Sequence, residues 1–445
     1  MLFLLLACAP QTKTAAVSYH QDIAPLLQEH CVSCHSPGNI APFALDNYAT
    51  ASAMGAAMLS AVEAGTMPPW LAQETDECSP ERPFADDLRL TEDEVGLLRD
   101  WVDAGTPEGD AATAAELPAA PALEIQDPDG SYLFPVEHWV EGEQDEFVCF
   151  VIDPGNTEPL WVTEAQLVPS NNRVAHHGLV MMAMQGPSAE WEDPNSFTCF
   201  NNPPGTHYLI STWTPGAVPN RVPEGTGMLM PAGARIVVQM HYHPTGEGPE
   251  VDQSTLQLKW TDQQPQWEAA QALVGNYDNL EDNGTGLQPG PNDAGGVPEF
   301  RIPAGSADHV ESMLYRQDFP LDFPIFSVGT HMHYVGTDMK IDLVDADGSE
   351  ECLVQTPAWD FNWQRSYNYD VPIDELPVIS DQEGLKFRCT YDNSMANPFV
   401  VKALGEQGLS EPHDVYLGEQ TLDEMCLGIF GILAPPGIFD RLFGG

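Results

Sequence analysis

The chain has 445 residues, a length that suggests two to four domains, and 42% of them are hydrophobic, which excludes an intrinsically disordered polymer. Its 67 acidic residues outnumber the 16 basic ones and give a formal net charge of −51, which argues against nucleic acid and anionic lipid as partners. The acidic surface has two interpretations: a solvated coat that keeps the protein soluble, or a field that steers a basic electron-transfer partner. The 37 glycines and 40 prolines favour short strands and turns over long helices.

Residues 1–18 are predicted to be a signal-like segment followed by a polar tether. The apolar residues 1–7 precede Cys8, and this start resembles the end of a bacterial lipoprotein signal. Cys8 would then be acylated and would anchor the protein to lipid; an ordinary signal-peptide core without a lipid is the alternative. No later run of about 18 apolar residues follows, so no other segment is predicted to span a membrane.

Residues 19–108 are predicted to form the first domain. Near its end, Thr91 and Glu94 have the spacing of a capping box, which predicts a helix that continues through Trp101 and ends at Gly105. Residues 31–35 of the same domain contain the motif C-x-x-C-H.

In that motif, the thiols of Cys31 and Cys34 would bond covalently to the vinyl groups of a haem, and His35 would ligate its iron. A redox pair of cysteines beside an incidental histidine is the alternative. Residues 19–35 and 65–70 resemble a class of bacterial periplasmic cytochrome c domains, over about 90 residues. The resemblance implies a small all-α domain that carries one haem c.

A cytochrome of this class needs a second axial ligand on the iron. Met67 is the predicted ligand, because a methionine before two prolines lies in a rigid loop and matches the family pattern. Met54 and Met58 compete with it, although their helical spacing is more typical of core residues. His20 and His30 are further candidates, but His30 lies too close to His35 in the sequence to reach the opposite face of the haem easily.

Residues 109–122 are rich in alanine and proline and are predicted to be a linker. Beyond it, β-rich stretches bounded by turns, such as 147–152, 235–241 and 386–391, are typical of antiparallel sandwiches. The region is long for one sandwich, so two all-β domains are predicted, at 123–262 and 263–440. Six cysteines have no assigned role: Cys78 of the first domain and five cysteines of the all-β region. Their even number predicts disulfides and export to the periplasm or the outer cell surface.

Histidines in the all-β region occur in pairs: His176 with His177, His241 with His243, and His331 with His333. On a strand, residues two apart point to the same face, so an H-x-H pair can bind one metal ion. Imidazole suits zinc, copper, iron and nickel, and a thioether would favour Cu(I). Met425 is one such thioether, but its spacing from the histidines does not single it out.

The order of several motifs resembles the copper type II, ascorbate-dependent monooxygenases, the family of peptidylglycine α-hydroxylating monooxygenase and dopamine β-monooxygenase. The matching segments are 174–178, 213–216, 223–227, 238–242, 302–305, 330–336 and 423–426. The resemblance implies two jelly-roll-like domains that each hold one copper and face each other across a cleft. It places the electron-transfer copper on His176, His177 and His241, and the oxygen-activating copper on the catalytic ligands His331, His333 and Met425. His243 then falls outside both ligand sets.

The resemblance also implies a disulfide between Cys389 and Cys426, beside Met425. Cys149 and Cys199 are a second candidate pair. Cys78 and Cys352 are left without an assigned partner.

Two departures from the family concern the substrate. The arginine that binds a substrate carboxylate two residues before the H-x-H pair is replaced by Gly329, and the polar residues after the Met-Cys pair correspond to Leu427 and Ile429. The predicted activity is therefore hydroxylation by O2 of a C–H bond in a small organic substrate that is not a C-terminal glycine, with electrons supplied through the fused cytochrome. Two alternatives stay open: a non-catalytic periplasmic copper-binding or electron-transfer protein on the same scaffold, and a zinc hydrolase that uses one H-x-H pair.

Overall fold

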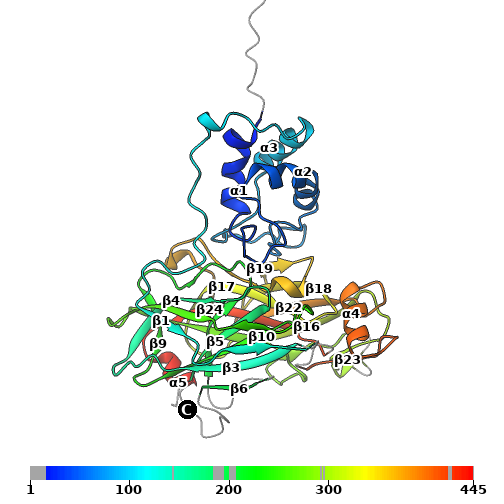
Figure 1. Cartoon of the computed structure of the whole chain (residues 1–445). Coiled ribbons are helices and arrows are strands. Elements are labelled where there is room, and N and C mark those ends of the chain that lie inside the picture. Colours follow the sequence, from blue (N-terminus) through cyan, green and yellow to red (C-terminus); the bar gives the residue numbers. More distant parts are fainter. Residues whose placement is uncertain are drawn as a thin grey trace, which may run out of the picture. The chain divides into compact units, whose positions relative to one another are not determined.

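The computed structural model describes residues 17–142, 145–183, 195–199, 207–290, 293, 296–418 and 423–443. They form two compact units (Figure 1). Unit 1 contains the described residues up to Pro69 together with Leu88–Pro121, and unit 2 contains Trp70–Asp87 and the described residues from Ala122 onward. Cys8 and most of the predicted signal segment lie outside the described residues.

Unit 1 is helical. Its elements are η1 (Tyr19–Ile23), α1 (Ala24–His30), α2 (Tyr48–Glu63), α3 (Glu92–Asp103) and the short turn η2 (Ala111–Thr113). Ile23, Leu98 and Trp101 are buried in the core between them. The predicted capping box at the start of α3 is confirmed, because Thr91 and Glu94 each accept the other's backbone N–H.

Unit 2 is mainly β-sandwich. In its amino-terminal half, one sheet has the order β6-β3-β10-β5-β7. These strands are β3 (Glu146–Ile152), β5 (Ala175–Ala183), β6 (Ser196–Thr198), β7 (His207–Trp213) and β10 (Arg235–Tyr242). The other sheet of this half contains β1 (Gly130–Leu133), β12 (Thr255–Thr261), β4 (Leu160–Val168) and β9 (Thr226–Met230), and β8 (Asn220–Arg221) pairs with β4. The stretches 147–152 and 235–241 are therefore strands, as predicted.

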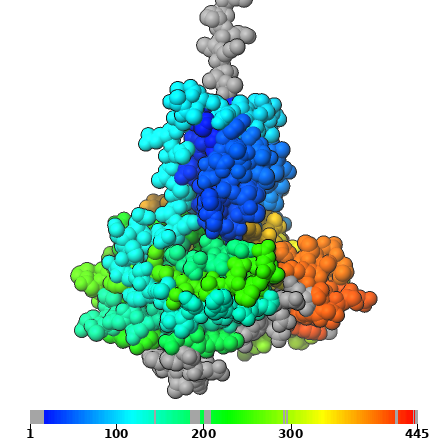
Figure 2. Space-filling model, in the orientation of Figure 1, coloured from blue at the N-terminus to red at the C-terminus, as the bar shows by residue number. Residues whose placement is uncertain are grey.

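The carboxyl-terminal half repeats this arrangement. One sheet contains β13 (Trp267–Gly275), β24 (Leu427–Ala434), β17 (Phe323–His331), β20 (Ser366–Asn368) and β21 (Val378–Ile379). The other contains β14 (Gly286–Leu287), β16 (His309–Arg316), β22 (Gly384–Tyr391), β18 (Gly336–Val344) and β19 (Glu350–Thr356). Two small ladders pair β2 (His138–Val140) with β11 (Glu250–Asp252) and β15 (Arg301–Ile302) with β23 (Val415–Tyr416). The helices are α4 (Pro398–Glu406), within the orange residues that project at the edge of unit 2 in Figure 2, and α5 (Ile438–Phe443).

The two halves share a sheet. β9 of the first half pairs in parallel with β13 of the second, with Thr226 opposite Trp267 and Gly227 opposite Glu268. This pairing joins the strands into one ten-stranded sheet that runs through both halves. The predicted boundary at 262–263 therefore falls between β12 and β13 but does not interrupt the sheet.

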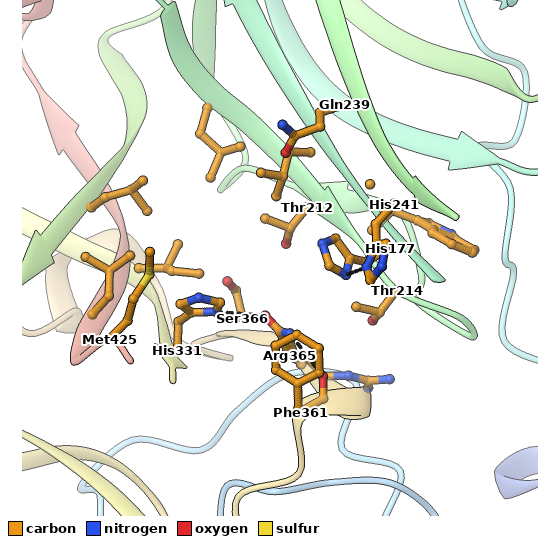
Figure 3. A pocket seen from close by; sticks show the side chains of 18 of the residues that line it. His177, Thr212, Thr214, Gln239, His241, His331, Phe361, Arg365, Ser366 and Met425 are labelled. Carbon is orange, nitrogen blue, oxygen red and sulfur yellow. Dashed lines mark hydrogen bonds between the residues drawn. The ribbon is translucent and has the colours of Figure 1, made fainter. Parts of the chain in front are cut away.

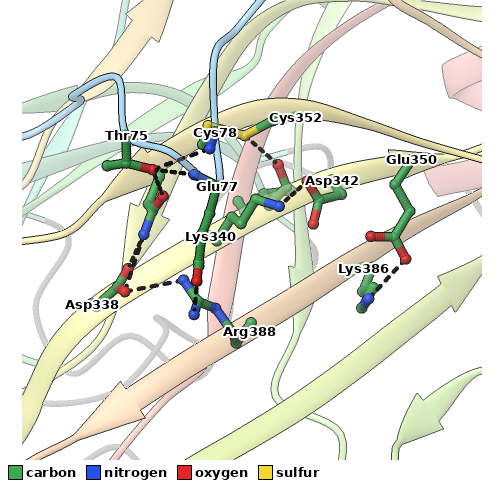
Figure 4. A network of polar contacts seen from close by, with 12 residues as sticks. Thr75, Glu77, Cys78, Asp338, Lys340, Asp342, Glu350, Cys352, Lys386 and Arg388 are labelled. Atoms are coloured by element: carbon green, nitrogen blue, oxygen red, sulfur yellow. Dashed lines mark hydrogen bonds and ion pairs between the residues drawn. A yellow bond between two sulfur atoms is a disulfide. The ribbon is translucent and has the colours of Figure 1, made fainter.

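Residues Trp70–Asp87 depart from the predicted domain order. They were expected inside the first domain, but the structure places them in unit 2. A disulfide joins Cys78 to Cys352 of β19, and the Thr75 hydroxyl donates a hydrogen bond of 2.6 Å to the Gln355 side chain (Figure 4). The disulfide spans 274 positions of sequence, so no local pattern could have indicated it.

Aromatic packing holds the same segment. Trp70 is buried, with its ring centroid 4.9 Å from that of Tyr367, and the Arg365 guanidinium lies 5.6 Å from the Trp70 ring. Phe84 stacks on Tyr369 at 5.3 Å. The segment thus contributes apolar side chains to the packing of unit 2.

The described residues contain three disulfides: Cys78–Cys352, Cys149–Cys199 and Cys389–Cys426. The predicted pairs 149–199 and 389–426 are confirmed, and the third joins the two cysteines left without an assigned partner. Disulfides of this number indicate an oxidising, exported environment. None of the described helices combines the length and the apolar character needed to cross a membrane.

Candidate functional site

The first histidine cluster lies where β5 and β10 pair. His241 pairs with His177, and the next pair joins Tyr242 to Ala175, so His176 is the extra residue of a β-bulge. Successive residues of a regular strand point to opposite faces. The bulge therefore explains why two adjacent histidines can turn toward the same point, which the sequence alone did not show.

The imidazole nitrogens of this cluster converge. Nδ1 of His177 lies 3.2 Å from Nδ1 of His176 and 3.3 Å from Nδ1 of His241. Nitrogen ligands bound at ~2.0–2.1 Å to one tetrahedral metal ion lie roughly 3.3 Å apart, so the spacing fits three ligands of one ion. The structure thus brings together the three residues that the resemblance assigned to one copper.

Electrostatics favour neutral imidazoles here. Burial lowers the pKa of His176 to about 4 and the pKa of His177 well below its usual value. Neutral imidazole is the form that binds metals. These two imidazoles can therefore ligate an ion at neutral pH without first losing protons.

Asp145 orients the third ligand and was missed in the sequence. Its carboxylate lies 2.9 Å from Nε2 of His241 and 2.6 Å from Nδ1 of His243. Burial alone would raise the pKa of Asp145, but the hydrogen bonds from the two histidines outweigh it and hold the pKa well below the usual range. A carboxylate on the distal nitrogen fixes the tautomer of a metal-binding histidine, so Nδ1 of His241 is left for the ion.

The second cluster lies at the end of β17 and before β24. Nδ1 of His331 is 2.7 Å from the Gln364 side-chain oxygen, and Nδ1 of His333 is 3.0 Å from the backbone oxygen of Asp423. Both rings are thus held through Nδ1, and Nε2 is the nitrogen that would ligate a metal. Burial lowers the pKa of His331 to about 3, so this imidazole is also neutral. Met425 lines the same cavity as the two histidines (Figure 3).

A buried carboxylate ties the Met425 loop to the H-x-H turn. Glu424 accepts backbone N–H groups from His333 at 2.8 Å, Val335 at 2.9 Å, Gly336 at 3.1 Å and Met425 at 2.9 Å. Burial raises the pKa of Glu424 to about 8, although these four donors favour the charged form. The Cys389–Cys426 disulfide anchors the same loop to β22. The sequence showed Glu424 beside Met425 but gave no sign of this role.

Both clusters line one cavity of about 510 Å³. Figure 3 shows His177 and His241 on one side of it and His331 and Met425 on the other. The ring centroid of Phe361 lies 6.1 Å from those of both His176 and His333, so the two imidazole centroids are at most about 12 Å apart. Much of the remaining wall is apolar, with side chains of Leu179, Met181, Leu209, Leu273, Leu427 and Ile429.

Gly329 lies behind Arg365 and Ser366, which line the cavity, and leaves little room for a larger side chain. A Cβ atom there would lie 2.9 Å from the Ser366 hydroxyl and 3.2 Å from the backbone oxygen of Arg365. Leu427 and Ile429 line the cavity at the positions where the family has polar groups. The family's carboxylate-binding arginine is thus replaced by a glycine at the point where β20 pairs closely with β17.

In unit 1, the C-x-x-C-H motif forms a turn after α1. The backbone N–H of His35 donates to the Cys31 carbonyl at 2.8 Å, and Nδ1 of His35 lies 3.1 Å from the carbonyl oxygen of Phe43. Burial lowers the pKa of His35 and raises the pKa of the Cys31 thiol to about 12. The described disulfides involve neither Cys31 nor Cys34. A neutral imidazole held through Nδ1 and two thiols on one turn fit the chemistry of covalent haem attachment.

Met67 follows α2 and is 36% exposed, and no described contact joins it to His35. Met54 and Met58 pack against the core of unit 1, as their helical spacing suggested. His30 contacts the Leu88 carbonyl and the Glu94 side chain through its two nitrogens. Met67 as the second axial ligand therefore stays a prediction.

Comparison with known proteins adds little. No protein-family model matches the chain, and no curated protein matches it. Similar solved structures include the major capsid protein P2 of bacteriophage PM2, with 10% identity over 66% of this chain and 99% of that one at a TM-score of 0.26. The empty top component of cowpea mosaic virus has 10% identity over 74% and 98% of the two chains, also at 0.26. Allantoicase has 12% identity over 56% and 78% at 0.15. Likeness at these TM-scores carries no argument about this protein.

Proposed function

We propose that the chain is an exported copper monooxygenase that hydroxylates a C–H bond of a small organic substrate. The overall reaction is R–H + O2 + two electrons + two protons, giving R–OH and H2O. One observation carries the proposal: three Nδ1 atoms converge at one end of a cavity whose other end is lined by His331, His333 and the Met425 thioether. Two candidate metal-binding sets on one cavity suit a two-electron oxidation that draws one electron from each of two copper ions.

The ligand types support different roles for the two clusters, one in electron storage and the other in reaction with O2. Copper bound at both clusters would supply two one-electron redox centres for the reduction of O2. His176, His177 and His241 would hold the electron-storing ion with three imidazoles on a pair of strands. His331, His333 and Met425 would hold the other ion, where the soft thioether favours the reduced state.

The walls of the cavity support an apolar substrate. Leu273, Leu427 and Ile429 lie among the residues that line it with Met425. They would give a hydrocarbon portion of a substrate an apolar surface beside the second cluster. A side chain at Gly329 would crowd the Ser366 hydroxyl and the Arg365 backbone oxygen, which disfavours an anion-binding arginine there. Substrates with an apolar C–H group are therefore expected to react faster than substrates with a carboxylate at that position.

Unit 1 supports a haem as the source of electrons. Cys31 and Cys34 would attach it, His35 would ligate its iron, and Met67 would be the second ligand. Only Pro68 and Pro69 separate Met67 from Trp70, which is packed in unit 2, so the chain ties the predicted axial ligand directly to the copper-binding unit. The fused haem thus takes the place of a small-molecule reductant.

Metal analysis of protein purified with its haem tests the proposal. Two coppers and one iron per chain are expected, together with O2 consumption that rises when an apolar amine, amide or hydrocarbon is added with a chemical reductant. One zinc per chain would overturn it. Two coppers and one iron with no hydroxylated product from any substrate would favour the copper-binding, electron-transfer alternative.

The haem relay needs its own measurement. The protein is reduced, O2 and substrate are added, and haem oxidation is followed by absorbance. Haem that is oxidised during turnover supports the relay, whereas haem that stays reduced while product forms contradicts it.

A further inference from the structure

One short segment, Trp359–Gln364, contacts both histidine clusters; it is called the bridge segment below. It contains the turn η4 (Phe361–Trp363), in which the Asp360 carboxylate accepts the Asn362 N–H at 2.9 Å. The Trp359 indole N–H donates to the His333 carbonyl at 3.2 Å, and the Gln364 side-chain N–H donates to the Phe361 carbonyl at 3.0 Å. The segment is thus fixed to the second cluster and closed on itself.

Phe361 lies between the clusters. Its ring stacks on the His176 ring at 6.1 Å with an interplanar angle of 23°, and it meets the His333 ring edge-on at 6.1 Å and 86°. Tyr334 packs edge-on against the same ring at 4.6 Å. A single aromatic side chain therefore contacts one predicted ligand of each copper.

Hydrogen bonds make a second connection between the same clusters. With His176 bound to copper through Nδ1, its Nε2–H donates to the Asn362 side-chain oxygen over a long 3.5 Å. With His331 bound through Nε2, its Nδ1–H donates to the Gln364 oxygen at 2.7 Å. Each connection starts from the histidine nitrogen that points away from the copper. Asn362 and Gln364 are two residues apart, so the two connections meet in the bridge segment.

We infer that the bridge segment carries the electron from one copper to the other and sets the distance between them. This inference rests on the proposed function. In the step, one electron would pass from the copper that His176, His177 and His241 would hold to the copper that His331, His333 and Met425 would hold, and O2 would be its final acceptor. Electron transfer through packed side chains falls off less steeply with distance than transfer across a solvent-filled gap. Phe361 is a positioning residue here, because it acts through the ligands it contacts.

The variant Phe361→Leu tests the inference, and Phe361→Tyr is the conservative rescue. Phe399→Leu of α4 is the matched control, because Phe399 stacks on Tyr334 at 5.7 Å and has no described ring contact with a predicted ligand. Rapid freeze-quench electron paramagnetic resonance follows the two coppers after reduced protein meets O2. Loss of the aromatic ring is expected to slow transfer between them by up to roughly a hundredfold, the cost that a misplacement of about 1 Å can carry at a reacting centre. Phe361→Tyr and Phe399→Leu are expected to retain the wild-type rate.

Two measurements separate a broken bridge from a damaged or misassigned site. Copper stoichiometry shows whether both ions still bind, and dipolar coupling in the fully oxidised protein gives the distance between them. Phe361→Leu with two coppers, slow transfer and a longer or broader distance distribution supports the inference. Two coppers with an unchanged distance and an unchanged rate overturn it but leave the proposed function standing. Wild-type protein that fails to bind two coppers overturns the proposed function itself.

Discussion

The two histidine clusters of unit 2 are built in contrasting ways. The first lies on paired strands, where sheet register and one β-bulge aim three Nδ1 atoms at a point. The second is assembled from a strand end, a turn and a loop, which a disulfide and the Glu424 carboxylate hold together. The contrast teaches that sheet register alone can make three imidazoles converge, whereas a methionine from a distant loop is held beside two histidines by a disulfide and a buried carboxylate.

Replacing Met425 by Ala removes the feature that distinguishes the second cluster and should have the largest effect. We expect O2-dependent hydroxylation to be lost, because two imidazoles alone hold Cu(I) poorly, while the haem spectrum and the copper of the first cluster remain. O2 consumption, product analysis and copper content are measured together. Met395→Ala is the control, since that methionine is 53% exposed. Unchanged product formation in Met425→Ala would remove Met425 from the site.

Removing a disulfide sharpens the comparison between the clusters. The pairs 389–426 and 149–199 close loops of 37 and 50 residues, so loss of either should cost about 4 kcal/mol of unfolding free energy by the chain-entropy estimate. Only the variant Cys389→Ala with Cys426→Ala should also lose copper from the second cluster, because that disulfide adjoins Met425. Thermal unfolding and copper content of the two double variants are compared. Equal copper loss in both would show that the effect is general destabilisation.

Asp145→Asn should have a smaller effect, confined to the first cluster. The amide keeps the shape but loses the charge that holds His241, and loss of such an outer carboxylate weakens metal binding by about 10–100-fold. Copper affinity is measured by competition with a chelator, site by site. Asp153→Asn is the control, because Asp153 pairs with Arg235 on the surface. Equal affinity in both variants would show that the charge of Asp145 contributes nothing to the site.

Much of the candidate site could be predicted from the sequence because its members carry motifs. His176 with His177, the H-x-H pair at His331 and the turn at 31–35 are each visible within five residues. The capping box of α3 and several strands were also visible, because local hydrogen-bonding and alternation rules govern them. The disulfide between Cys389 and Cys426 came from resemblance rather than from spacing.

The rest depends on contacts between residues far apart in the chain. Asp145 reaches His241 across 96 positions, and Gln364 reaches His331 across 33, with no pattern that links either pair. The bulge at His176 depends on how β5 registers against β10, which the sequence of one strand does not contain. The placement of Trp70–Asp87 failed for the same reason, since its partners lie on β19 and β20.

That segment has a consequence for how the protein could be divided. The chain passes between the units three times, at 69–70, 87–88 and 121–122, and the middle excursion is locked by Cys78–Cys352. A single cut in the linker would therefore not separate the units. A fragment that ends at residue 108 would carry Trp70, Phe84 and an orphaned thiol away from their partners.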